Sequence, residues 1–467
     1  PPPPFYINRP PPISTHFPYT TLFRSIENRI NSNRFEFGIL YGRRRIGKTT
    51  LLKQIVKSKN ALYFVANSMG LEYNLKQLSQ SIAAYFNEPI TFEDFESIFK
   101  YLAKRSHDQK IIFILDEFTY LMDSNDKILT IIQNSIDQYL IDTSVCLIIS
   151  GSHVGMIEDA LTYQKPLYGR STFKLKLEAF DYYEASKFYP NVTSIDKIRL
   201  YSVFGGVPFY ISRIDPNQSV RDNIINLIIE TGAIFEDEIN FFLSQEVRSQ
   251  SSYGRILNAI ASGSTRVNEI STKAGNIPSG QLVSYLNILI NLGIIEKDIC
   301  FGSNDQSRKT LYRIKDPLFR FHYTFIERNK SQKAIMNASL FYDQYVETKL
   351  DEFIALEFES VAQRFLIIKH SGQLERIGRY WANDARARID IEIDIVASIK
   401  DTLIAYECKW TNSPVDLQIV NQLREKAKYL SIENLGFFSK NKFTADVYKT
   451  NYLLYTIDDL YSSLINI

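Results

Sequence analysis

The chain has 467 residues, of which 45% are hydrophobic, and its formal net charge is +2 at pH 7. This length predicts about three domains, and the near-neutral charge excludes a protein whose whole surface attracts nucleic acid or membranes. Three widely separated cysteines (Cys146, Cys300 and Cys408) exclude a disulfide framework, and the absence of a membrane-spanning or signal-peptide stretch predicts a cytoplasmic protein with no membrane partner.

Residues 1–25 are expected to form a disordered leader. Proline runs at residues 1–4 and 10–12 cannot enter a helix or a central strand. Residues 17–25 look like the translation of a common sequencing-library adapter, which would make the leader an assembly artefact. The other interpretation is an ordinary proline-rich tail, and no function is assigned to these residues under either one.

Residues 42–50 read GRRRIGKTT and complete the G-x-x-x-x-G-K-[ST] pattern of a phosphate-binding loop. The apolar residues 37–41 precede the loop as a buried strand would. In such loops the backbone N–H groups face the phosphates, Lys48 lies near the β- and γ-phosphates, and the Thr49 hydroxyl is placed for Mg²⁺. The alternative is a Gly-rich turn before a basic helix. We expect ATP or GTP to bind here, with ATP the favoured nucleotide, through Gly42, Arg43, Arg44, Arg45, Ile46, Gly47, Lys48, Thr49 and Thr50.

A second strand ends in two carboxylates. Residues 111–117 read IIFILDE, an apolar run typical of a strand that is buried on both faces of a parallel sheet. In phosphate-loop enzymes an Asp at this strand end holds the Mg²⁺ water shell, and a following Glu polarises the attacking water. We therefore predict that Asp116 serves the metal and that Glu117 is the catalytic base. The alternative is a strand that ends in solvated acids.

Residues 26–180 alternate between strands and helices. Further strands are expected at residues 61–65, 145–152 and 174–177, with helices between them. This alternation predicts an α/β fold with a parallel sheet that carries helices on both faces, so residues 26–180 are expected to form a phosphate-loop ATPase core.

Two further positions of this core are candidates for phosphate contacts. Ser150 or Ser152, at the end of the third apolar strand, would touch the γ-phosphate or the attacking water, unless they are only turn residues. Arg170 would reach a phosphate of its own chain or act as an arginine finger on a neighbouring subunit of a homo-oligomer. The alternative for Arg170 is a solvated loop residue.

Three segments follow the core. Residues 181–245 read as a helical lid with a break at residues 204–208. Residues 246–315 read as three short helices and a two-stranded hairpin, which is the pattern of a winged helix-turn-helix. Such modules bind DNA or proteins, or are structural, and the third helix offers few basic residues for reading DNA. Residues 316–345 are a connector.

Residues 346–467 contain a second candidate site. Residues 389–397 alternate charged and apolar side chains, as a strand does, and residues 402–410 form a second strand. Two residues apart on a strand, Glu407 and Lys409 project from one face. A later helix offers Gln418 and Lys426 to support the site.

We predict that Asp394 lies opposite Glu407, and that Glu359 joins them from the preceding helix. Their oxygens suit Mg²⁺, while Lys409 would orient a water or stabilise developing charge. We therefore predict a nuclease-type site with Asp394, Glu407 and Lys409 as catalytic residues and Glu359, Asp394 and Glu407 as metal ligands. The alternative is two half-exposed strands whose charged faces are solvated.

The amino-terminal motifs resemble those of the archaeal-type ATPases, which are AAA+-related and have affinity to the STAND NTPases. The resemblance rests on residues 42–49, 115–117, 150–152, 167–170 and 204–208. The family opens with an F-x-x-R-E-x-E-L-like box, of which only residues 5–9 remain in this chain.

The carboxyl-terminal part is similar to a domain of unknown function that often follows this ATPase and has the PD-(D/E)xK nuclease-like fold. This similarity rests on residues 358–359, 392–396 and 407–410. It implies a metal-dependent nuclease-like module as the output of the ATPase. We therefore expect a Mg²⁺-dependent ATPase that acts as a switch coupled to a DNA-binding, nuclease-like domain of residues 346–467. The alternative is a regulatory or scaffolding ATPase whose nuclease-like domain binds nucleic acid without cleaving it.

Overall fold

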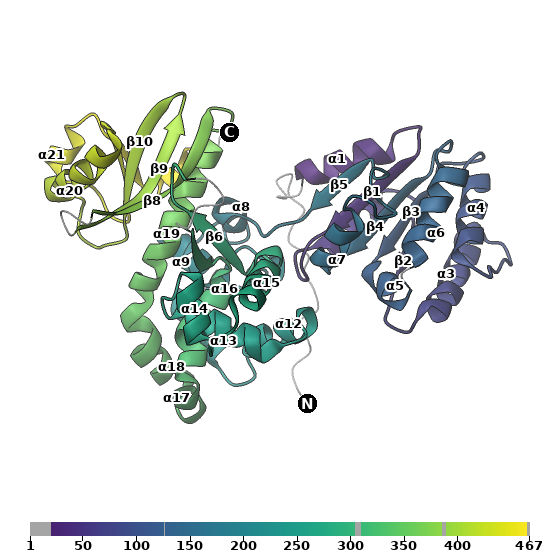
Figure 1. Cartoon of the computed structure of the whole chain (residues 1–467), viewed down its shortest axis with the longest axis horizontal. Coiled ribbons are helices and arrows are strands. Elements are labelled where there is room, and N and C mark those ends of the chain that lie inside the picture. The colour runs from purple at the N-terminus through teal and green to yellow at the C-terminus, as the bar shows by residue number, and fades with distance from the viewer. Residues whose placement is uncertain (1–19, 126, 304–309, 385–388, 465–467) are drawn as a thin grey trace. The chain divides into compact units, whose positions relative to one another are not determined.

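The computed structural model describes residues 20–125, 127–303, 310–384 and 389–464. The chain divides into two compact units, which Figure 1 shows as ribbons. Unit 1 consists of the chain up to Ala179 together with Val207–Phe209, and unit 2 consists of Phe180–Gly206 and the chain from Tyr210 onward.

Unit 1 is built on a five-stranded parallel sheet in the order β2-β3-β4-β1-β5. Its strands are β1 (Glu36–Tyr41), β2 (Leu62–Val65), β3 (Ile112–Asp116), β4 (Cys146–Gly151) and β5 (Phe173–Lys176). Every residue of β3 and β4 is buried, as expected for central strands that are covered on both faces. The predicted α/β class with a parallel sheet is confirmed.

Helices lie on both sides of this sheet (Figure 1). They are α1 (Thr20–Ile30), α2 (Lys48–Ser58), α3 (Leu71–Phe86), α4 (Phe95–Arg105), α5 (Thr119–Ser124), α6 (Lys127–Ser135) with the π-helical turn η1 (Ile136–Leu140), and α7 (Val154–Ala160). One core joins the helices from α3 to α7 to the sheet, with Leu78, Phe99 and Ile132 among its fully buried members.

Helix α1 corrects one prediction. Residues 20–25 were assigned to a disordered leader, but α1 begins at Thr20. Its apolar residues Leu22, Ile26 and Ile30 recur every four positions, so they share one helix face, and Ile26 and Ile30 are buried. Burial of this face explains why the segment is helical. The rest of the leader, including residues 5–9, lies outside the described residues.

Unit 2 begins with the segment predicted as a helical lid. The segment contains α8 (Tyr182–Ser186), α9 (Ser194–Phe204), α11 (Val220–Ile224) with the π-helical turn η2 (Ile225–Ile229), and α12 (Glu238–Glu246). The short helix α10 (Pro208–Ile211) begins in residues that belong to unit 1. The predicted break follows α9. A Cβ atom on Gly206 would lie 1.8 Å from the carbonyl oxygen of Phe180, so only glycine fits there.

The next elements are three helices and an antiparallel hairpin. They are α13 (Gln250–Ala261), α14 (Val267–Lys273), α15 (Ser279–Asn291), β6 (Ile295–Ile299) and β7 (Thr310–Ile314). This is the element order expected for a winged helix, and the assignment as a winged helix stays a prediction. Helix α15 contains no charged residue.

A run of helices then leads to the second sheet. It consists of α16 (Pro317–Phe321), η3 (His322–Ile326), η4 (Glu327–Asn329), α17 (Lys330–Ile335), α18 (Ala338–Phe341), η5 (Tyr342–Glu347) and the long helix α19 (Thr348–Lys369). Among the residues that the structure describes, every helix is too short or too polar to span a bilayer.

The second sheet has five strands in the order β12-β11-β10-β9-β8 and is mixed. Its strands are β8 (Leu374–Asp384), β9 (Ile389–Ile399), β10 (Thr402–Lys409), β11 (Asn434–Ser439) and β12 (Leu453–Thr456). The first three are antiparallel, whereas β10, β11 and β12 are parallel. Helices α20 (Leu417–Ala427) with η6 (Lys428–Leu430), α21 (Ala445–Tyr448) and α22 (Asp459–Ser462) complete the unit.

The two faces of this sheet are covered by different helices. On β11, Phe437 packs in a buried cluster with Val420 and Leu423 of α20. Its neighbour Phe438 contacts Phe365 of α19, with ring centroids 5.8 Å apart. Because successive strand residues point to opposite faces, α20 covers one face and α19 the other.

Candidate nucleotide site and carboxylate cluster

The phosphate loop connects β1 to α2, as predicted. Gly47 is the residue that caps α2, and its φ of 94° is in the left-handed region. Gly47 has no side chain to accept a hydrogen bond from the first turn of the helix. Arg45 also has a positive φ, 69°. Left-handed residues in a loop turn successive N–H groups to one side, which is how such loops bind anions.

Lys48 lies inside the loop. Its ammonium group donates to the carbonyl oxygens of Gly42 (2.7 Å) and Arg43 (3.0 Å), and the residue is only 4% exposed. A buried ammonium must be hydrogen-bonded, and loop carbonyls perform that task here. The charge is therefore held within the loop where a phosphate would bind.

The carboxylate of Asp116, at the end of β3, is fully buried and accepts four hydrogen bonds. Thr49 Oγ1 (3.0 Å) and the Tyr63 hydroxyl (2.7 Å) donate to Oδ2. Ser150 Oγ (2.7 Å) and the backbone N–H of Glu117 (3.0 Å) donate to Oδ1. The predicted residues Thr49 and Asp116 are thus in direct contact, and Ser150 touches Asp116.

Glu117 follows Asp116 with a φ of 52°, a left-handed conformation that is rare for a residue other than glycine. Its carboxylate accepts a hydrogen bond from Ser152 Oγ at 2.8 Å. The strained backbone turns Glu117 away from the strand direction, and Ser152 fixes its side chain. Ser152 therefore contacts the predicted base.

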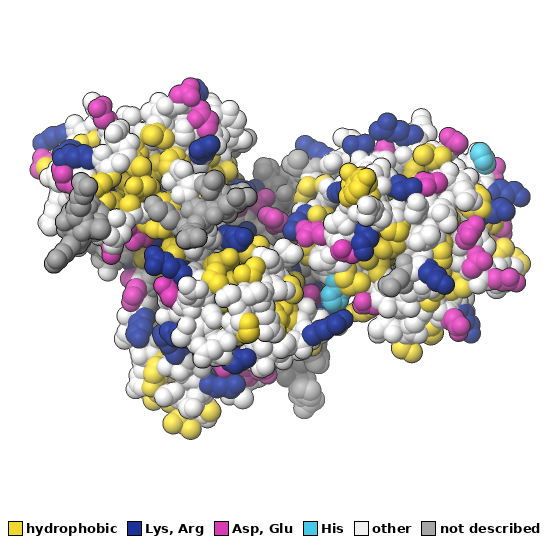
Figure 2. Space-filling view, viewed as in Figure 1, with side chains coloured by type: hydrophobic (Ala, Val, Ile, Leu, Met, Phe, Trp, Pro, Cys, Tyr) yellow, Lys and Arg dark blue, Asp and Glu magenta, His cyan; other side chains and the backbone are white. Residues whose placement is uncertain are grey.

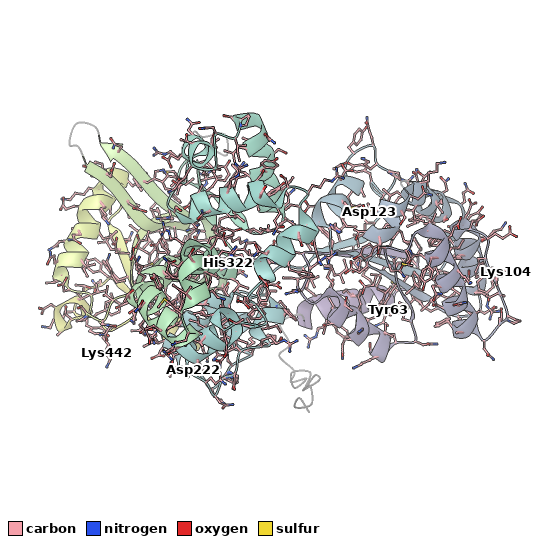
Figure 3. The ribbon with its side chains drawn as sticks, turned by 90° about the horizontal axis from the view of Figure 1, so that it is seen from below. Tyr63, Lys104, Asp123, Asp222, His322 and Lys442 are labelled. Carbon is pink, nitrogen blue, oxygen red and sulfur yellow. The ribbon has the colours of Figure 1, made fainter. Side chains whose placement is uncertain are left out.

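Sequence reasoning missed Tyr63. This residue lies on β2, and Figure 3 labels it in unit 1. Burial, followed by the hydrogen bond to Asp116, raises the pKa of its hydroxyl, which stays a neutral donor. The only available signal was a tyrosine in the strand expected at residues 61–65, because that strand, β2, pairs directly with β3.

The other residues of the loop that were predicted to bind the nucleotide differ in their contacts and burial. A Cβ on Gly42 would meet the Leu177 carbonyl oxygen at 2.4 Å. Arg44 donates to the Tyr120 hydroxyl (3.4 Å), and the Arg45 guanidinium lies 4.4 Å from the Phe209 ring centroid. Of the others, Arg43 and Ile46 are buried and Thr50 is exposed.

Arg170 is engaged elsewhere. Its guanidinium donates to both carboxylate oxygens of Asp137, at 2.9 and 2.7 Å, and to the carbonyl oxygen of Pro166 at 3.0 Å. This bidentate pair holds Arg170 on the η1 turn. The structure thus places Arg170 in an ion pair, and its predicted phosphate contact stays a prediction.

In unit 2, an irregularity in the sheet positions the second site. Gly378 pairs with Val396 and Tyr380 with Ile393, so two residues of β9, Asp394 and Ile395, lie opposite the single residue Arg379. Such bulges re-aim side chains. The Asp394 carboxylate accepts from the backbone N–H of Cys408 at 2.7 Å, just beyond the last residue of β10 that pairs with β9.

Glu407 lies between two lysines. Lys409 Nζ donates to its Oε1 at 2.7 Å, and Lys426 Nζ of α20 donates to its Oε2 at 3.2 Å. The predicted same-face placement of Glu407 and Lys409 is therefore observed. Lys426 contacts Glu407, and its role in supporting a catalytic site stays a prediction.

The carboxylates of this cluster influence one another. Burial, followed by the charges of Glu407 and Glu359, raises the pKa of Asp394 to about 8. Burial is also the main cause that raises the pKa of Glu359, which forms an ion pair with Arg379 at 3.7 Å. The predicted quartet of Glu359, Asp394, Glu407 and Lys409 is thus brought together, with Lys426 and Arg379 as its cations.

The predicted metal ligands do not fit a metal ion as they stand. Across the described ranges, no group of three or more His, Cys, Asp and Glu side chains is arranged to hold one. Each carboxylate already contacts a cation or a backbone N–H. The cluster is therefore an internally neutralised set of charges in this structure.

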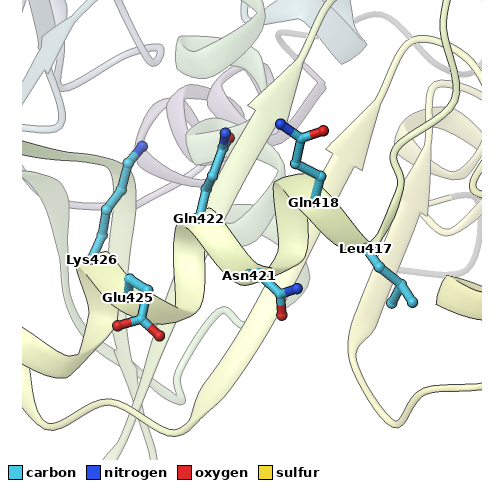
Figure 4. A pocket seen from close by; sticks show the side chains of 6 residues that line it. All are labelled: Leu417, Gln418, Asn421, Gln422, Glu425 and Lys426. Carbon is cyan, nitrogen blue, oxygen red and sulfur yellow. The ribbon is translucent and has the colours of Figure 1, made fainter.

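Helix α20 presents a polar stripe beside this cluster. Figure 4 shows Gln418, Gln422 and Lys426 extending from one side of the helix, and Leu417, Asn421 and Glu425 from the other. The first three recur every fourth residue, which aligns them on one face. Because Lys426 contacts Glu407, this stripe leads directly to the carboxylates.

A phosphate loop at the carboxyl end of β1, beside an acidic end of β3, defines unit 1 as a phosphate-loop ATPase-type domain. Residues 22–214 match the protein family described as an ATPase domain predominantly from Archaea. Residues 322–426 match a family described as archaeal and bacterial proteins of unknown function. The two matches therefore cover separate parts of the chain, one in the segment with the phosphate loop and one in the segment with the carboxylate cluster.

One relative spans most of the chain, and a second covers a short part of it. An uncharacterized protein of Methanocaldococcus jannaschii is 29% identical over 424 residues, covering 88% of this chain and 91% of the relative. A second uncharacterized protein of that organism is 47% identical over 55 residues, covering 12% of this chain and 53% of its own length.

Two solved structures are also similar. A Walker-type ATPase of Pyrococcus abyssi has 19% identity and a TM-score of 0.48, with 66% of this chain and 95% of that chain covered. The ORC2 protein of Aeropyrum pernix, in its ADPNP–ADP complexes, has 18% identity and a TM-score of 0.44, with 70% and 97% covered.

Proposed function

We propose that this protein is an ATP-dependent molecular switch whose unit 1 hydrolyses ATP and whose unit 2 binds nucleic acid through the nuclease-like segment of residues 346–467. Three segments would link the ATPase part to the nuclease-like part. They are the lid at residues 181–245, the winged helix at residues 246–315 and the connector at residues 316–345. The observation that carries the ATPase role is the 3.0 Å contact between Thr49 Oγ1 and Asp116 Oδ2, which joins the phosphate loop to the acidic strand.

The residues around that contact fit ATP with Mg²⁺. Thr49 and Asp116 offer the hard oxygen donors that Mg²⁺ prefers, and the ion would neutralise charge on the phosphates. Lys48 would leave the loop carbonyls and bind a phosphate. Glu117, held by Ser152, would orient the attacking water and accept its proton.

Isothermal titration with ATP and Mg²⁺ tests the binding step. Lys48→Ala should weaken ATP binding by roughly a hundredfold or more, because a buried charge that meets the phosphates is lost. Lys53→Ala is the matched control, since Lys53 lies exposed on the same helix and should leave the affinity unchanged. Equal affinities for the wild type and Lys48→Ala would refute the assignment.

In unit 2, we propose that nucleic-acid phosphates bind along Lys409, Lys426 and the stripe of Gln418 and Gln422. Lysines bind phosphates as point charges, and amide side chains add hydrogen bonds to the backbone. Helix α15 is a poor alternative because it carries no charged residue. Figure 2 shows acidic and basic side chains intermingled on the face drawn, in keeping with a local contact.

Cleavage is the second candidate function of unit 2, and the gathering of Asp394, Glu407 and Lys409 favours it. Incubation with plasmid DNA and Mg²⁺ or Mn²⁺ separates the two. Release of nucleotides that is lost in Lys409→Ala, but kept in the exposed control Lys428→Ala, would establish cutting. Retention of plasmid in a gel-shift assay without cleavage under either metal would establish binding alone.

A further inference from the structure

Tyr63 reaches the acidic end of β3 from the neighbouring strand. In the parallel register of β2 and β3, Tyr63 is aligned with Ile114. Aligned residues, and residues two apart on one strand, lie on the same face of a sheet, so Tyr63, Ile114 and Asp116 share a face. The next residue, Phe64, belongs to the core on the opposite face, together with Leu115. A long side chain is needed at residue 63, because Asp116 lies two residues further along β3 than Ile114.

The Tyr63 hydroxyl meets the Asp116 oxygen that also faces the phosphate loop. It donates to Oδ2 at 2.7 Å, and Thr49 Oγ1 donates to the same atom at 3.0 Å. The other oxygen, Oδ1, accepts from Ser150 Oγ and from the backbone N–H of Glu117. Each carboxylate oxygen has two lone pairs, so both oxygens have a donor for each of them. Asp116 therefore cannot turn without breaking one of these hydrogen bonds.

The two donors to Oδ2 come from different elements. Thr49 belongs to α2, directly after the phosphate loop, and its hydroxyl oxygen is also the predicted ligand of Mg²⁺. Tyr63 belongs to an edge strand of the sheet. Burial, followed by the hydrogen bond to Asp116, raises the pKa of Tyr63, so its hydroxyl keeps the hydrogen that it donates. A metal ion that draws Thr49 toward itself would therefore leave the Tyr63 hydrogen bond in place.

We infer that Tyr63 is a positioning residue, which orients the Asp116 carboxylate toward the predicted metal ligand Thr49 so that Mg²⁺ strengthens ATP binding. The inference rests on the proposed ATPase function of unit 1 and adds the residue on which its magnesium dependence relies. A tyrosine that served packing alone would affect ATP binding equally with and without the ion. A positioning tyrosine affects only the complex that contains the ion, because it acts through a carboxylate that serves the metal.

Isothermal titration of the full chain with ATP, once with Mg²⁺ and once with EDTA, separates these two roles. Tyr63→Phe keeps the ring and removes the hydroxyl, so its affinity in EDTA should equal that of the wild type. With Mg²⁺ its affinity should be at least about tenfold weaker, which is the loss expected when a hydrogen bond behind a metal ligand is removed. The matched control is Tyr101→Phe. Tyr101 of α4 donates to the carboxylate of Glu88 at the same distance, 2.7 Å, and its variant should behave as the wild type.

Two further variants keep the inference open to refutation, with circular dichroism as the check on folding. If Tyr63→Phe does not fold, Tyr63→Met removes the same hydroxyl with a flexible side chain that adapts to the space, and it should give the same result. Replacement of Tyr63 by para-aminophenylalanine restores a donor on the ring and should restore the magnesium dependence. A folded para-amino variant that binds ATP with Mg²⁺ as weakly as Tyr63→Phe would overturn the inference.

Two outcomes for Tyr63→Phe itself would also overturn it. One is an affinity with Mg²⁺ equal to that of the wild type, and the other is a loss of the same size in EDTA. A wild type that binds no ATP, or binds it equally well with and without Mg²⁺, would overturn the proposed function and the inference with it. The wild-type titrations alone therefore distinguish the two failures.

Discussion

Asp116 in unit 1 and Glu359 in unit 2 are both largely buried carboxylates, yet their surroundings differ. Asp116 is surrounded by neutral donors, namely three hydroxyl groups and one backbone N–H. Glu359 has the guanidinium of Arg379, and its neighbour Glu407 has two lysines. The Asp116 carboxylate is thus stabilised by neutral hydrogen-bond donors, whereas Glu359 and Glu407 are neutralised by charged side chains.

The difference teaches how readily each site would accept a cation. A hydroxyl group rotates and can accept as well as donate, so Thr49 and its neighbours can turn toward a metal without leaving a charge unpaired. A buried guanidinium must move away, and its removal leaves uncompensated carboxylates. The surroundings of Asp116 would therefore admit a cation with less rearrangement than those of Glu359.

The largest expected effect tests the role of Glu117 in the ready site. Glu117→Gln should keep ATP affinity near that of the wild type but slow phosphate release by about 10²–10³-fold, because the amide cannot accept the proton of water. Steady-state phosphate release and ATP titration measure the two properties. Unchanged turnover would mean that the polar site is not poised for hydrolysis.

The second prediction is that unit 2 loses stability at low pH because of its buried histidine, His322. Burial, followed by Lys330 and Lys333, lowers the pKa of His322 from 6.5 to about 4. The unfolded chain then binds more protons than the folded one between these values. The contribution of neutral His322 to the free energy of unfolding is therefore fully present above pH 6.5. It falls by up to about 3 kcal/mol as the pH drops to 4.

Urea unfolding at pH 7 and pH 4.5 measures this loss in unit 2, because both tryptophans, Trp381 and Trp410, belong to that unit. His322→Phe should lose less stability than the wild type between the two values. The exposed His107 of unit 1 provides the control His107→Phe, which should behave as the wild type. Figure 3 labels His322 in unit 2. Identical acid sensitivity of all three proteins would contradict the assignment.

The third prediction removes one hydroxyl group from around Asp116. Ser150 is fully buried and donates to the carboxylate at 2.7 Å, so Ser150→Ala should lower the free energy of unfolding of unit 1 by about 2 kcal/mol. Thermal unfolding followed by circular dichroism measures the effect. Ser58→Ala, which removes an exposed hydroxyl at the end of α2, is the control and should change little.

The smallest effect is expected at Arg170. Its pair with Asp137 is partly exposed, and such pairs contribute at most about 1 kcal/mol. Arg170→Ala and Asp137→Asn should therefore have equally small effects on stability, and both should keep ATP affinity within about threefold. A drop in phosphate release for Arg170→Ala alone, greatest at high protein concentration, would instead identify an arginine finger acting between copies of the chain.

Sequence reasoning located unit 1 well because its signals are local. A pattern of a few residues is enough to predict the loop at residues 42–50 and the strand at residues 111–117. Both elements lie where they were predicted. Tyr63 was missed because its role depends on β2 lying beside β3, a contact between segments about fifty residues apart.

The second sheet was predicted only in part. Strand β9 alternates charged and apolar residues, and β10 was expected as the strand after it, whereas β8, β11 and β12 were not expected. Strand β8 contains charged, aromatic and small residues without a regular period, and its place is set by pairing with β9 and by the segment after β6. Arg379 was missed for the same reason, since its three carboxylates come from distant parts of the chain.

Tyr182, near the start of unit 2, donates its hydroxyl hydrogen to the carbonyl oxygen of Leu460 in α22 at 2.9 Å. Its ring also meets that of Tyr461, with centroids 5.6 Å apart. Residues near the start of unit 2 therefore pack against α22, and a ribosome must deliver the chain through α22 before this contact can form. The strands of the unit 1 sheet end at Lys176, so unit 1 is able to fold while most of unit 2 is still being made.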